Sequence, residues 1–529
     1  MRFTTTAVIA LTASLICAGT ALAEVRGANE DPANTEKTDK TVTVALPSEP
    51  STILGSVVSK AEDEIEIVSG CITDTLVTRD KGTGDVIPCL ATEWEWVDDT
   101  HCRFTLRDDV TMTDGTPLVA DDVAYSFNVF ATSSPNTDTG RYIALNDDGS
   151  ADCVVEDEHT VTIGFSTIAP DFLKMLTWAN FGIFSEDEVE ALGGLEEASN
   201  NPVLGSGKYI FDSWERGQSI TLKRNENYWN PDYAGYYETI VFTFQNDPAS
   251  RAMSVQSGDA QVAYNMPITQ AANYAETDGV DAVIYEYGQN VRMWYNMTEG
   301  HVTEDQTVRE AISKALNHYA IAAVGTANFG GPTFGYFGTD SPYYNATYSE
   351  EDITLDVEGA KALLEEAGYG DGLELTILGL QYQEPVYTVI QENLRAIGIN
   401  LTLDIPDTAQ FVESAFAGNY DLIALGDYVD ARYPSIISMM QQSMLDAGTV
   451  FGGPKATTPE IDAAITDAIQ EPDEAEAKEK MATVENLMKE VCACTELYPE
   501  MVGAVVSDNV KGYTTRERGY VDATMLYEG

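Results

Sequence analysis

The sequence predicts an α/β protein with a parallel sheet in its second half. Apolar strand patterns and amphipathic helix patterns alternate there, and a glycine, Gly398, is placed to close the first helix. Strand, helix, strand, helix, strand is the unit that builds a parallel sheet. The expected strands are residues 373–380, 399–405 and 421–426, and the expected helices are residues 386–397 and 409–416.

The rest of the chain mixes shorter elements. Thr41–Leu46 alternates threonine and valine, the period of a half-buried strand, and Phe104–Arg107 and Val161–Gly164 also read as strands. Residues 70–200 are therefore expected to combine short strands and helices. One helical face is predicted to carry Val308, Ile312, Ala315, Leu316 and Tyr319.

The net charge of the chain argues against some classes of binding partner. The 529 residues include 86 acidic against 29 basic side chains, a net charge of −57, with an ordinary hydrophobic content of 44%. The length predicts two to four structural units. Nucleic acid and anionic lipid surfaces both require clustered Lys and Arg, which this chain lacks. The composition favours a soluble protein, and the negative field attracts cationic ligands.

The N-terminus has the pattern of an exported protein. Residues 1–23 contain a basic residue, an apolar run and a small-residue cleavage site, which is typical of a signal peptide. Residues 24–40 are expected to be a flexible tether. Lipidation at Cys17 is the alternative to simple cleavage. No later run has the roughly 20 apolar residues of a membrane helix, so the mature protein is expected to lie outside the membrane or to be lipid-anchored at its outer face.

Six cysteines remain after the leader, and an exported chain permits disulfides. A local bridge among Cys71, Cys89 and Cys102 is expected, with buried free thiols as the alternative. Cys492 and Cys494 do not have zinc-ligand spacing.

Catalytic and cofactor motifs are missing from the sequence. The four histidines are scattered, and no nucleophile elbow or phosphate-binding loop is present. We expect no enzyme activity, no cofactor and no metal site.

The best candidate site follows the strand at 421–426. Ligands of open α/β sheets bind at the carboxyl ends of parallel strands. The next residues provide carboxylates, a guanidinium and aromatic rings, which together suit a zwitterion; a solvated polar loop is the alternative. These residues are Asp427, Tyr428, Asp430, Arg432 and Tyr433.

An ordered series of motifs covers roughly residues 41–520. The most specific part runs from Asp74-Thr75-Leu76 to Asp114-Gly115-Thr116-Pro117 and Ala120-Asp121-Asp122-Val123. Later members are Gly205-Ser206-Gly207, Trp294-Tyr295-Asn296 and Val510-Lys511-Gly512-Tyr513. With these motifs the chain resembles the extracytoplasmic solute-binding proteins of ABC importers, in the large peptide, nickel and opine family 5.

The resemblance implies a two-lobed periplasmic-binding-protein-like fold of the large class II type, with an additional mixed α/β domain. Two segments would cross between the lobes, and the ligand would be enclosed by hinge closure. The implied division is domain I in 41–68, 204–289 and 497–529, domain II in 69–203, and domain III in 290–496.

The resemblance also implies site residues. Asp427, or Asp430 in a shifted alignment, matches the aspartate that holds a peptide's amino terminus in relatives. The family's proline and tryptophan near this loop are displaced or absent, with Pro434 and Ala424-Leu425-Gly426 in this chain. Ser48 and Glu49 match the cleft-lining exit of the first strand, with a turn role as the alternative. Trp294, Tyr295 and Asn296 stand where domain III begins, where core packing is the alternative.

By resemblance, the protein would be a monomer that captures dipeptides or oligopeptides and delivers them to the permease and ATPase subunits of an ABC transporter. A sugar, opine or other solute is the alternative ligand, and nickel fits poorly with so few histidines. A sensory receptor or chaperone-like module on the same fold is the alternative from another class.

Overall fold

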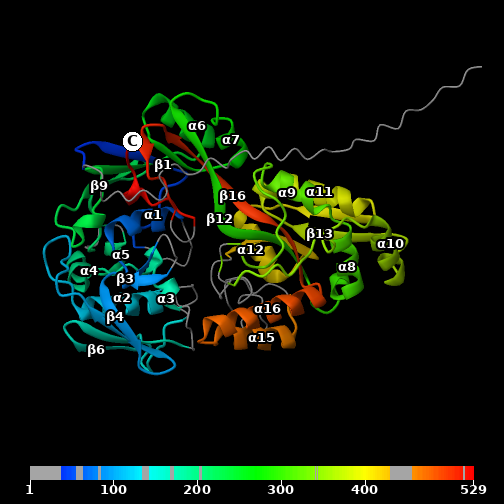
Figure 1. Ribbon diagram of the computed structural model, residues 1–529, viewed down its shortest axis with the longest axis horizontal. Helices are drawn as coiled ribbons and strands as arrows, with labels where there is room; N and C mark the ends of the chain where they lie inside the picture. The colour runs from blue at the N-terminus through cyan, green and yellow to red at the C-terminus, as the bar shows by residue number, and fades with distance from the viewer. Residues whose placement is uncertain are drawn as a thin grey trace, which may run out of the picture.

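The computed structural model describes residues 37–54, 63–80, 85–133, 142–166, 172–199, 201, 205–339, 341, 343–428, 456–515 and 519–529. In these residues the chain forms two lobes joined by two long strands (Figure 1). The predicted leader with Cys17 and most of the predicted tether lie outside the described residues. Within the described ranges, no helix is long and apolar enough to cross a membrane.

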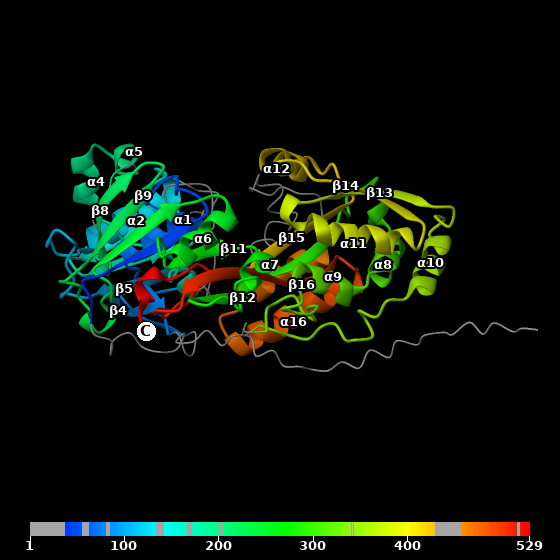
Figure 2. The same ribbon diagram turned by 90° about the horizontal axis from the view of Figure 1, so that it is seen from above.

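A ten-stranded sheet runs through both lobes in the order β14-β13-β15-β12-β16-β11-β1-β10-β9-β8. β12 and β16 pair antiparallel over most of their length and connect the lobes, as Figure 2 shows from above. The strands are β1 (Thr41–Leu46), β8 (Tyr209–Glu215), β9 (Ser219–Arg224), β10 (Thr239–Phe244), β11 (Val262–Met266), β12 (Val280–Tyr295), β13 (Leu373–Leu378), β14 (Ile399–Asp404), β15 (Leu422–Tyr428) and β16 (Cys494–Ser507).

The first lobe is built around β1, which confirms the strand predicted at Thr41–Leu46. β1 pairs parallel with β10 and β11, and its valines lie in a fully buried apolar core. Asp247 caps the start of α6, where its side chain accepts from Ser250 N, and Gly258 ends that helix in the left-handed region. The remaining elements are α1 (Asp63–Ile72), α6 (Pro248–Ser257), α7 (Ile268–Ala272), β17 (Val510–Lys511) and β18 (Tyr527–Glu528).

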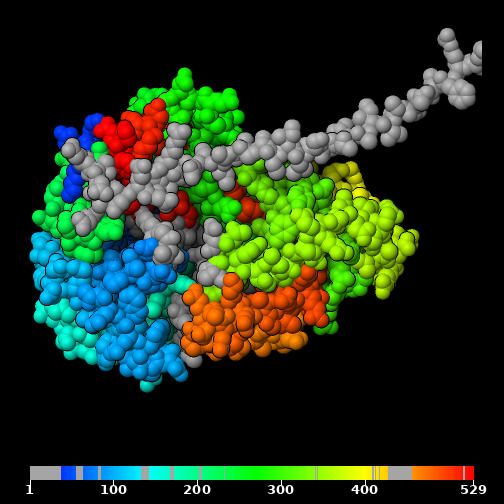
Figure 3. Space-filling model, in the orientation of Figure 1, coloured from blue at the N-terminus to red at the C-terminus, as the bar shows by residue number. Residues whose placement is uncertain are grey.

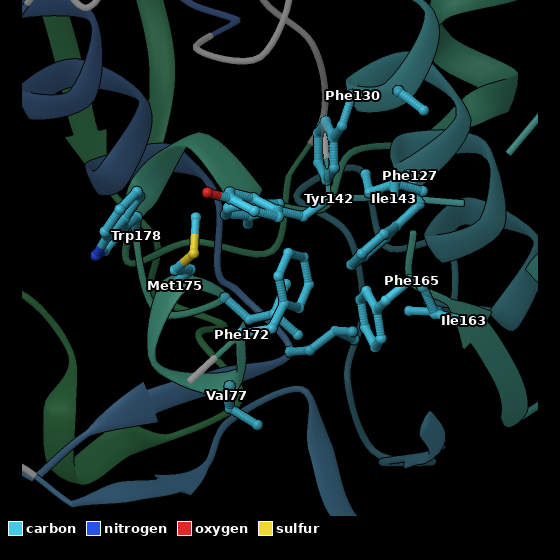
Figure 4. Close-up of a cluster of buried hydrophobic side chains, with 14 of the residues drawn as sticks. Val77, Phe127, Phe130, Tyr142, Ile143, Ile163, Phe165, Phe172, Met175 and Trp178 are labelled. Carbon is cyan, nitrogen blue, oxygen red and sulfur yellow. The ribbon is translucent and has the colours of Figure 1, made fainter. Parts of the chain in front are cut away.

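A separate four-stranded sheet, ordered β4-β5-β7-β6, extends the first lobe. The strands predicted at 104–107 and 161–164 fall in β5 and β7. Phe172 packs 4.2 Å from Phe165 and 5.7 Å from Phe181 between ring centroids, within the aromatic core of Figure 4. The elements are β2 (Val77–Arg79), β3 (Val86–Pro88), β4 (Ala91–Trp96), β5 (His101–Leu106), α2 (Ala120–Ser133), β6 (Cys153–Asp157), β7 (Thr160–Gly164), α3 (Phe172–Met175), α4 (Glu186–Leu192) and α5 (Leu195–Ala198).

The second lobe contains the predicted parallel unit. β13 pairs parallel with β14 on one side and with β15 on the other, so the chain changes direction across the sheet at β13. Such a switch leaves a crevice at the carboxyl ends of the strands. The helices are α8 (Gln306–Lys314), α9 (His318–Gly325), α10 (Val357–Glu366), α11 (Glu384–Arg395), α12 (Thr408–Ala417), α15 (Pro459–Ile469) and α16 (Glu474–Glu490).

Three expectations for this lobe need correction. The single helix expected to carry Val308 and Tyr319 is two helices, because Asn317 caps a new helix with a bond from Ala320 N to its side chain. α11 ends at Arg395 with Ala396 as its cap, and Gly398, at φ 89°, leads into β14 instead. β15 continues to Tyr428 because β12 supplies a pairing partner for its last residues.

The expected local disulfide is also absent. All six cysteines of the described residues are free thiols, and five of them are buried. Of the three cysteines expected to form it, Cys71 lies in the apolar core around β1 and Cys102 in that of the four-stranded sheet, so these two thiols belong to different cores. The buried-thiol alternative is the one the structure supports.

Candidate functional site

The two lobes meet where β12 and β16 cross between them. The pairing of these strands is interrupted between Glu286 and Asn290, opposite Met501 and Pro499. A break in the ladder removes backbone hydrogen bonds at the point where the lobes join. The carboxyl end of β15 reaches the same level of the sheet, because Asp427 stands opposite Asn290 in register.

The sequence predicts that Asp427 and Tyr428 lie in a loop, but in the structure they are the last two residues of strand β15. Their backbone lies at the carboxyl edge of the parallel strands, beside the lobe junction. Asp430, Arg432 and Tyr433 lie outside the described residues.

Ser48 and Glu49 follow β1 at its carboxyl end. The Ser48 hydroxyl donates to Oε1 of Glu64 at 2.7 Å. The Glu49 carboxylate accepts from Trp214 Nε1 at 2.8 Å and from the Gly217 amide at 3.1 Å. Both side chains thus hold neighbouring parts of the first lobe together.

Trp294 and Tyr295 end β12 inside the second lobe, and Asn296 follows them. Each exposes no more than 1% of its surface. Tyr295 shares a 2.6 Å hydrogen bond with the Thr495 hydroxyl, and Asn296 donates to the Tyr420 carbonyl at 2.9 Å. The indole Nε1 of Trp294 is buried with no hydrogen-bond partner in the described part of the protein. These contacts fit the packing alternative that the sequence left open.

A group that the sequence did not indicate lies at the junction itself. Glu500 of β16 accepts from the Tyr382 hydroxyl at 3.3 Å. Tyr382 belongs to a short helical turn, Gln381–Gln383, that follows the carboxyl end of β13. Gln289 of β12 and Glu500 both direct a side-chain oxygen at Gly426, the residue before Asp427. No motif marks Glu500, because its neighbours come together only through the pairing of distant strands.

Asp63, at the start of α1 in the first lobe, lies close enough to Glu500 to act on it electrostatically. Its carboxylate accepts from the hydroxyls of Tyr264, at 3.2 Å, and Tyr287. Burial raises the pKa of Glu500 to about 7; the hydrogen bond from Tyr382 opposes this rise, and the nearby Asp63 carboxylate adds to it. Residues of both lobes and both crossing strands therefore share one electrostatic environment.

The junction is accessible to water although protein surrounds it. Tyr382 exposes 64% of its surface, yet burial raises its pKa well above the usual value. Both observations hold for a side chain that has protein on several sides while much of its surface remains in contact with water. In Figure 3 the first lobe, in blue, cyan and green, lies directly beside the second lobe, in yellow-green and orange.

The cleft offers hydrogen-bond acceptors more than donors. The carboxylate of Glu500 and the amide oxygen of Gln289 suit a ligand rich in N–H groups. Among the described residues, no group of three His, Cys, Asp or Glu side chains is placed to hold a metal ion. The arrangement is suited to enclosing a polar solute between lobes.

Comparisons with known proteins agree with this architecture. The periplasmic murein peptide-binding protein of Escherichia coli K12 is 22% identical over 477 residues, which cover 85% of this chain and 86% of that protein. A peptide-binding protein of Helicobacter pylori, solved with the peptide STSA, superimposes with a TM-score of 0.75 at 20% identity, over 93% of this chain and 98% of that one. A binding protein from A. tumefaciens R10, in complex with agropinic acid, gives a TM-score of 0.71 at 23% identity, over 93% and 99%.

These structural likenesses confirm the two-lobed periplasmic-binding-protein fold predicted from the sequence motifs. The family model of bacterial extracellular solute-binding proteins, family 5, matches residues 85–447, which is more than half of the chain. The chain therefore belongs to the bacterial extracellular solute-binding proteins of family 5.

Proposed function

We propose that this protein is the substrate-binding component of an ABC importer and that it captures short peptides between its lobes. The observation that carries the proposal is that the carboxyl end of β15, at Asp427, meets the acceptor side chains of Gln289 and Glu500 where the two lobes join. A peptide presents an ammonium group and a row of backbone N–H groups, which need such acceptors.

Two relatives support a peptide ligand, since one is a murein peptide-binding protein and another was solved with a bound peptide. In this proposal the protein acts outside the cytoplasm as a monomer, performs no chemistry, and hands its ligand to membrane permease and ATPase subunits. Asp427 or Asp430 would hold the ligand ammonium, with Tyr428, Arg432 and Tyr433 completing the wall.

The domain division read from the sequence stays part of this proposal. Domain III at 290–496 would begin and end within the crossing strands, and the four-stranded sheet would form most of domain II at 69–203. An opine-like solute is the second candidate, because the relative with agropinic acid shares the fold.

The test is to purify the protein, denature it, and identify the released ligand by mass spectrometry. Short peptides of mixed sequence are expected. A single defined opine or glycoside would overturn the peptide proposal and leave the importer role standing.

A further inference from the structure

One surface helix of the second lobe has no charged face. Residues 315–339 contain no Asp, Glu, Lys or Arg, although these residue types make up 22% of the chain. α9 lies within this stretch. A surface helix normally turns an apolar face to the core and a charged or polar face to water, so α9 is an exception in a chain with a net charge of −57.

Only one face of α9 is buried. The helix packs against β16 and α11, and its buried residues are His318, Ile321 and Ala322. The residues of the opposite face follow the helical period and are Tyr319, Ala320, Ala323 and Val324. These four residues, here called the α9 patch, present only methyl, isopropyl and phenol groups to the solvent.

The α9 patch is well exposed. Tyr319 exposes 54% of its surface and Val324 exposes 41%, and Phe329, in the turn after the helix, exposes 40%. The neighbouring helices differ, since α10 and α11 carry charged residues such as Glu358 and Glu392 at exposed positions. Adjoining exposed apolar residues of this kind mark interaction surfaces more often than single ones do.

The α9 patch lies beside the strands that join the lobes, as Figures 1 and 2 both show. Gly325, at the end of α9, packs so closely on β16 that a Cβ there would stand 2.4 Å from Cζ of Tyr498. A Cβ at Gly330 would stand 3.5 Å from Cγ of Pro499, which borders the break in the pairing of β12 and β16. A partner on the patch would therefore contact the second lobe close to its junction with the first.

The charge around the α9 patch determines which partner fits. Both carboxylate oxygens of Glu350 accept from the Tyr319 hydroxyl at 2.8 Å, so the edge of the patch is acidic. A second copy would bring the same net charge of −57, and anionic lipid headgroups would be repelled in the same way. A protein surface with an apolar centre and Lys or Arg at its edge complements both the patch and its acidic edge.

We propose that the α9 patch is a docking surface for a membrane protein whose contact region is apolar with a basic edge, namely the permease subunit of the importer. This inference rests on the proposed function and adds where the permease binds. It concerns the outer surface of the second lobe and none of the residues assigned to the ligand.

The first test identifies the partner by photo-crosslinking in cells of the native host. The photoreactive residue p-benzoylphenylalanine takes the place of Val324 or, as a control, of Val97, which follows β4 and exposes 49% of its surface. Mass spectrometry of the adducts is expected to find a transmembrane subunit of an ABC transporter for position 324 and no such adduct for position 97.

The second test measures binding of the purified protein to right-side-out membrane vesicles from host cells that lack its gene. Val324→Glu places an unpaired carboxylate in an apolar contact and is expected to weaken binding about tenfold or more. Val97→Glu makes the same change on the first lobe and is expected to bind as the wild type does. Both variants should keep the unfolding temperature and the peptide affinity of the wild type, and liposomes of the extracted host lipids should bind none of the three proteins.

Several outcomes overturn the docking surface and leave the proposed function standing. They are an adduct at position 324 with a second copy, with lipid or with a protein of another class, no adduct at all, equal vesicle binding by Val324→Glu and the wild type, or binding to the protein-free liposomes. The identification of released ligand tests the proposed function separately. If the purified protein releases no small solute and position 324 yields no transporter adduct, the importer role is wrong and the docking surface falls with it.

Discussion

Arg292 and Glu496 form a fully buried ion pair between the two strands that join the lobes. The guanidinium Nε lies 3.1 Å from both carboxylate oxygens, and the two residues are directly paired in register. Arg292 also donates to the Tyr336 carbonyl at 2.6 Å and stacks over the Tyr336 ring at 3.6 Å. The pair fixes the second-lobe ends of β12 and β16 to the segment that contains Tyr336.

Removal of one partner of this pair should destabilise the protein strongly. Glu496→Ala leaves the Arg292 charge buried without its counter-ion, and the expected loss is about 3–5 kcal/mol of unfolding free energy. Urea denaturation measures it. The double variant Arg292→Met with Glu496→Leu buries no charge and should recover most of the loss. A double variant as unstable as Glu496→Ala would show that packing, not the uncompensated charge, causes the defect.

Asp427 and Asp430 can be distinguished by peptide affinity. Replacing the carboxylate that holds the ligand ammonium with asparagine should weaken binding by more than about tenfold, or roughly 1.4 kcal/mol, because a charge-assisted hydrogen bond is lost. Asp404→Asn, at the carboxyl end of β14, which β13 separates from β15 in the same sheet, is the matched control and should bind normally. If neither Asp427→Asn nor Asp430→Asn crosses the tenfold limit, the ammonium anchor is not an aspartate of this segment.

Glu500 should make the protein less stable as the pH rises. Its pKa is about 7 in the folded protein, against an ordinary 4.5, so the folded state binds an extra proton between these values. The contribution of Glu500 to the free energy of unfolding is therefore greatest below about pH 4.5. It decreases as the pH rises to about 7, by up to about 3 kcal/mol in total. The groups that act on Glu500 are the Tyr382 hydroxyl and the Asp63 carboxylate. The Glu500 charge in turn adds to burial in raising the pKa of Tyr382, Tyr387 and Tyr498.

The measurement compares urea unfolding of the wild type and Glu500→Gln at pH 4.5 and pH 8. The variant should be more stable at pH 8 and nearly equal to the wild type at pH 4.5. A constant difference at both pH values would mean that Glu500 does not titrate in this range.

Lys174 connects the lobes on the side away from the crossing strands. It extends from α3 to the start of α16, where Nζ lies 3.3 Å from Oε1 of Glu474, and it stands 5.3 Å from the Tyr343 ring centroid. Because these contacts join the two lobes, they stabilise this arrangement relative to any in which the lobes lie further apart. Lys174→Met should weaken ligand binding about two- to fivefold, mainly through faster dissociation, as expected for a partly exposed pair.

Stopped-flow dissociation rates provide the measurement. Lys361→Met removes an ion pair within α10, with Glu358 at 3.2 Å, and should leave the rate unchanged. Equal rates for Lys174→Met and the wild type would show that this contact does not bias closure.

Much of the fold follows from local pattern. Alternation at Thr41–Leu46 and the repeated strand–helix order of residues 373–428 specify elements that form through nearby backbone bonds and one apolar face. The local sequence pattern predicted the wrong element boundary where a distant strand or a capping side chain determined the structure instead. The strand predicted to end at Gly426 continues to Tyr428 because β12, more than 130 residues earlier, lies beside it. Asn317 divided a continuous apolar face by capping a second helix.

The residues of the candidate site also divide into those that local sequence predicts and those that only the tertiary structure brings together. The sequence by itself determined the family and the parallel strands, because each motif and each strand depends on residues close together in the chain. It placed Asp427 in the loop after the strand, whereas the structure includes Asp427 in β15. Only the tertiary structure decided that Glu49 holds the β8–β9 hairpin and that Tyr295 and Asn296 are bonded internally. It also assembled Asp63, Gln289, Tyr382, Gly426 and Glu500, since electrostatic fields and shared cavities depend on distance in space and not on separation along the chain.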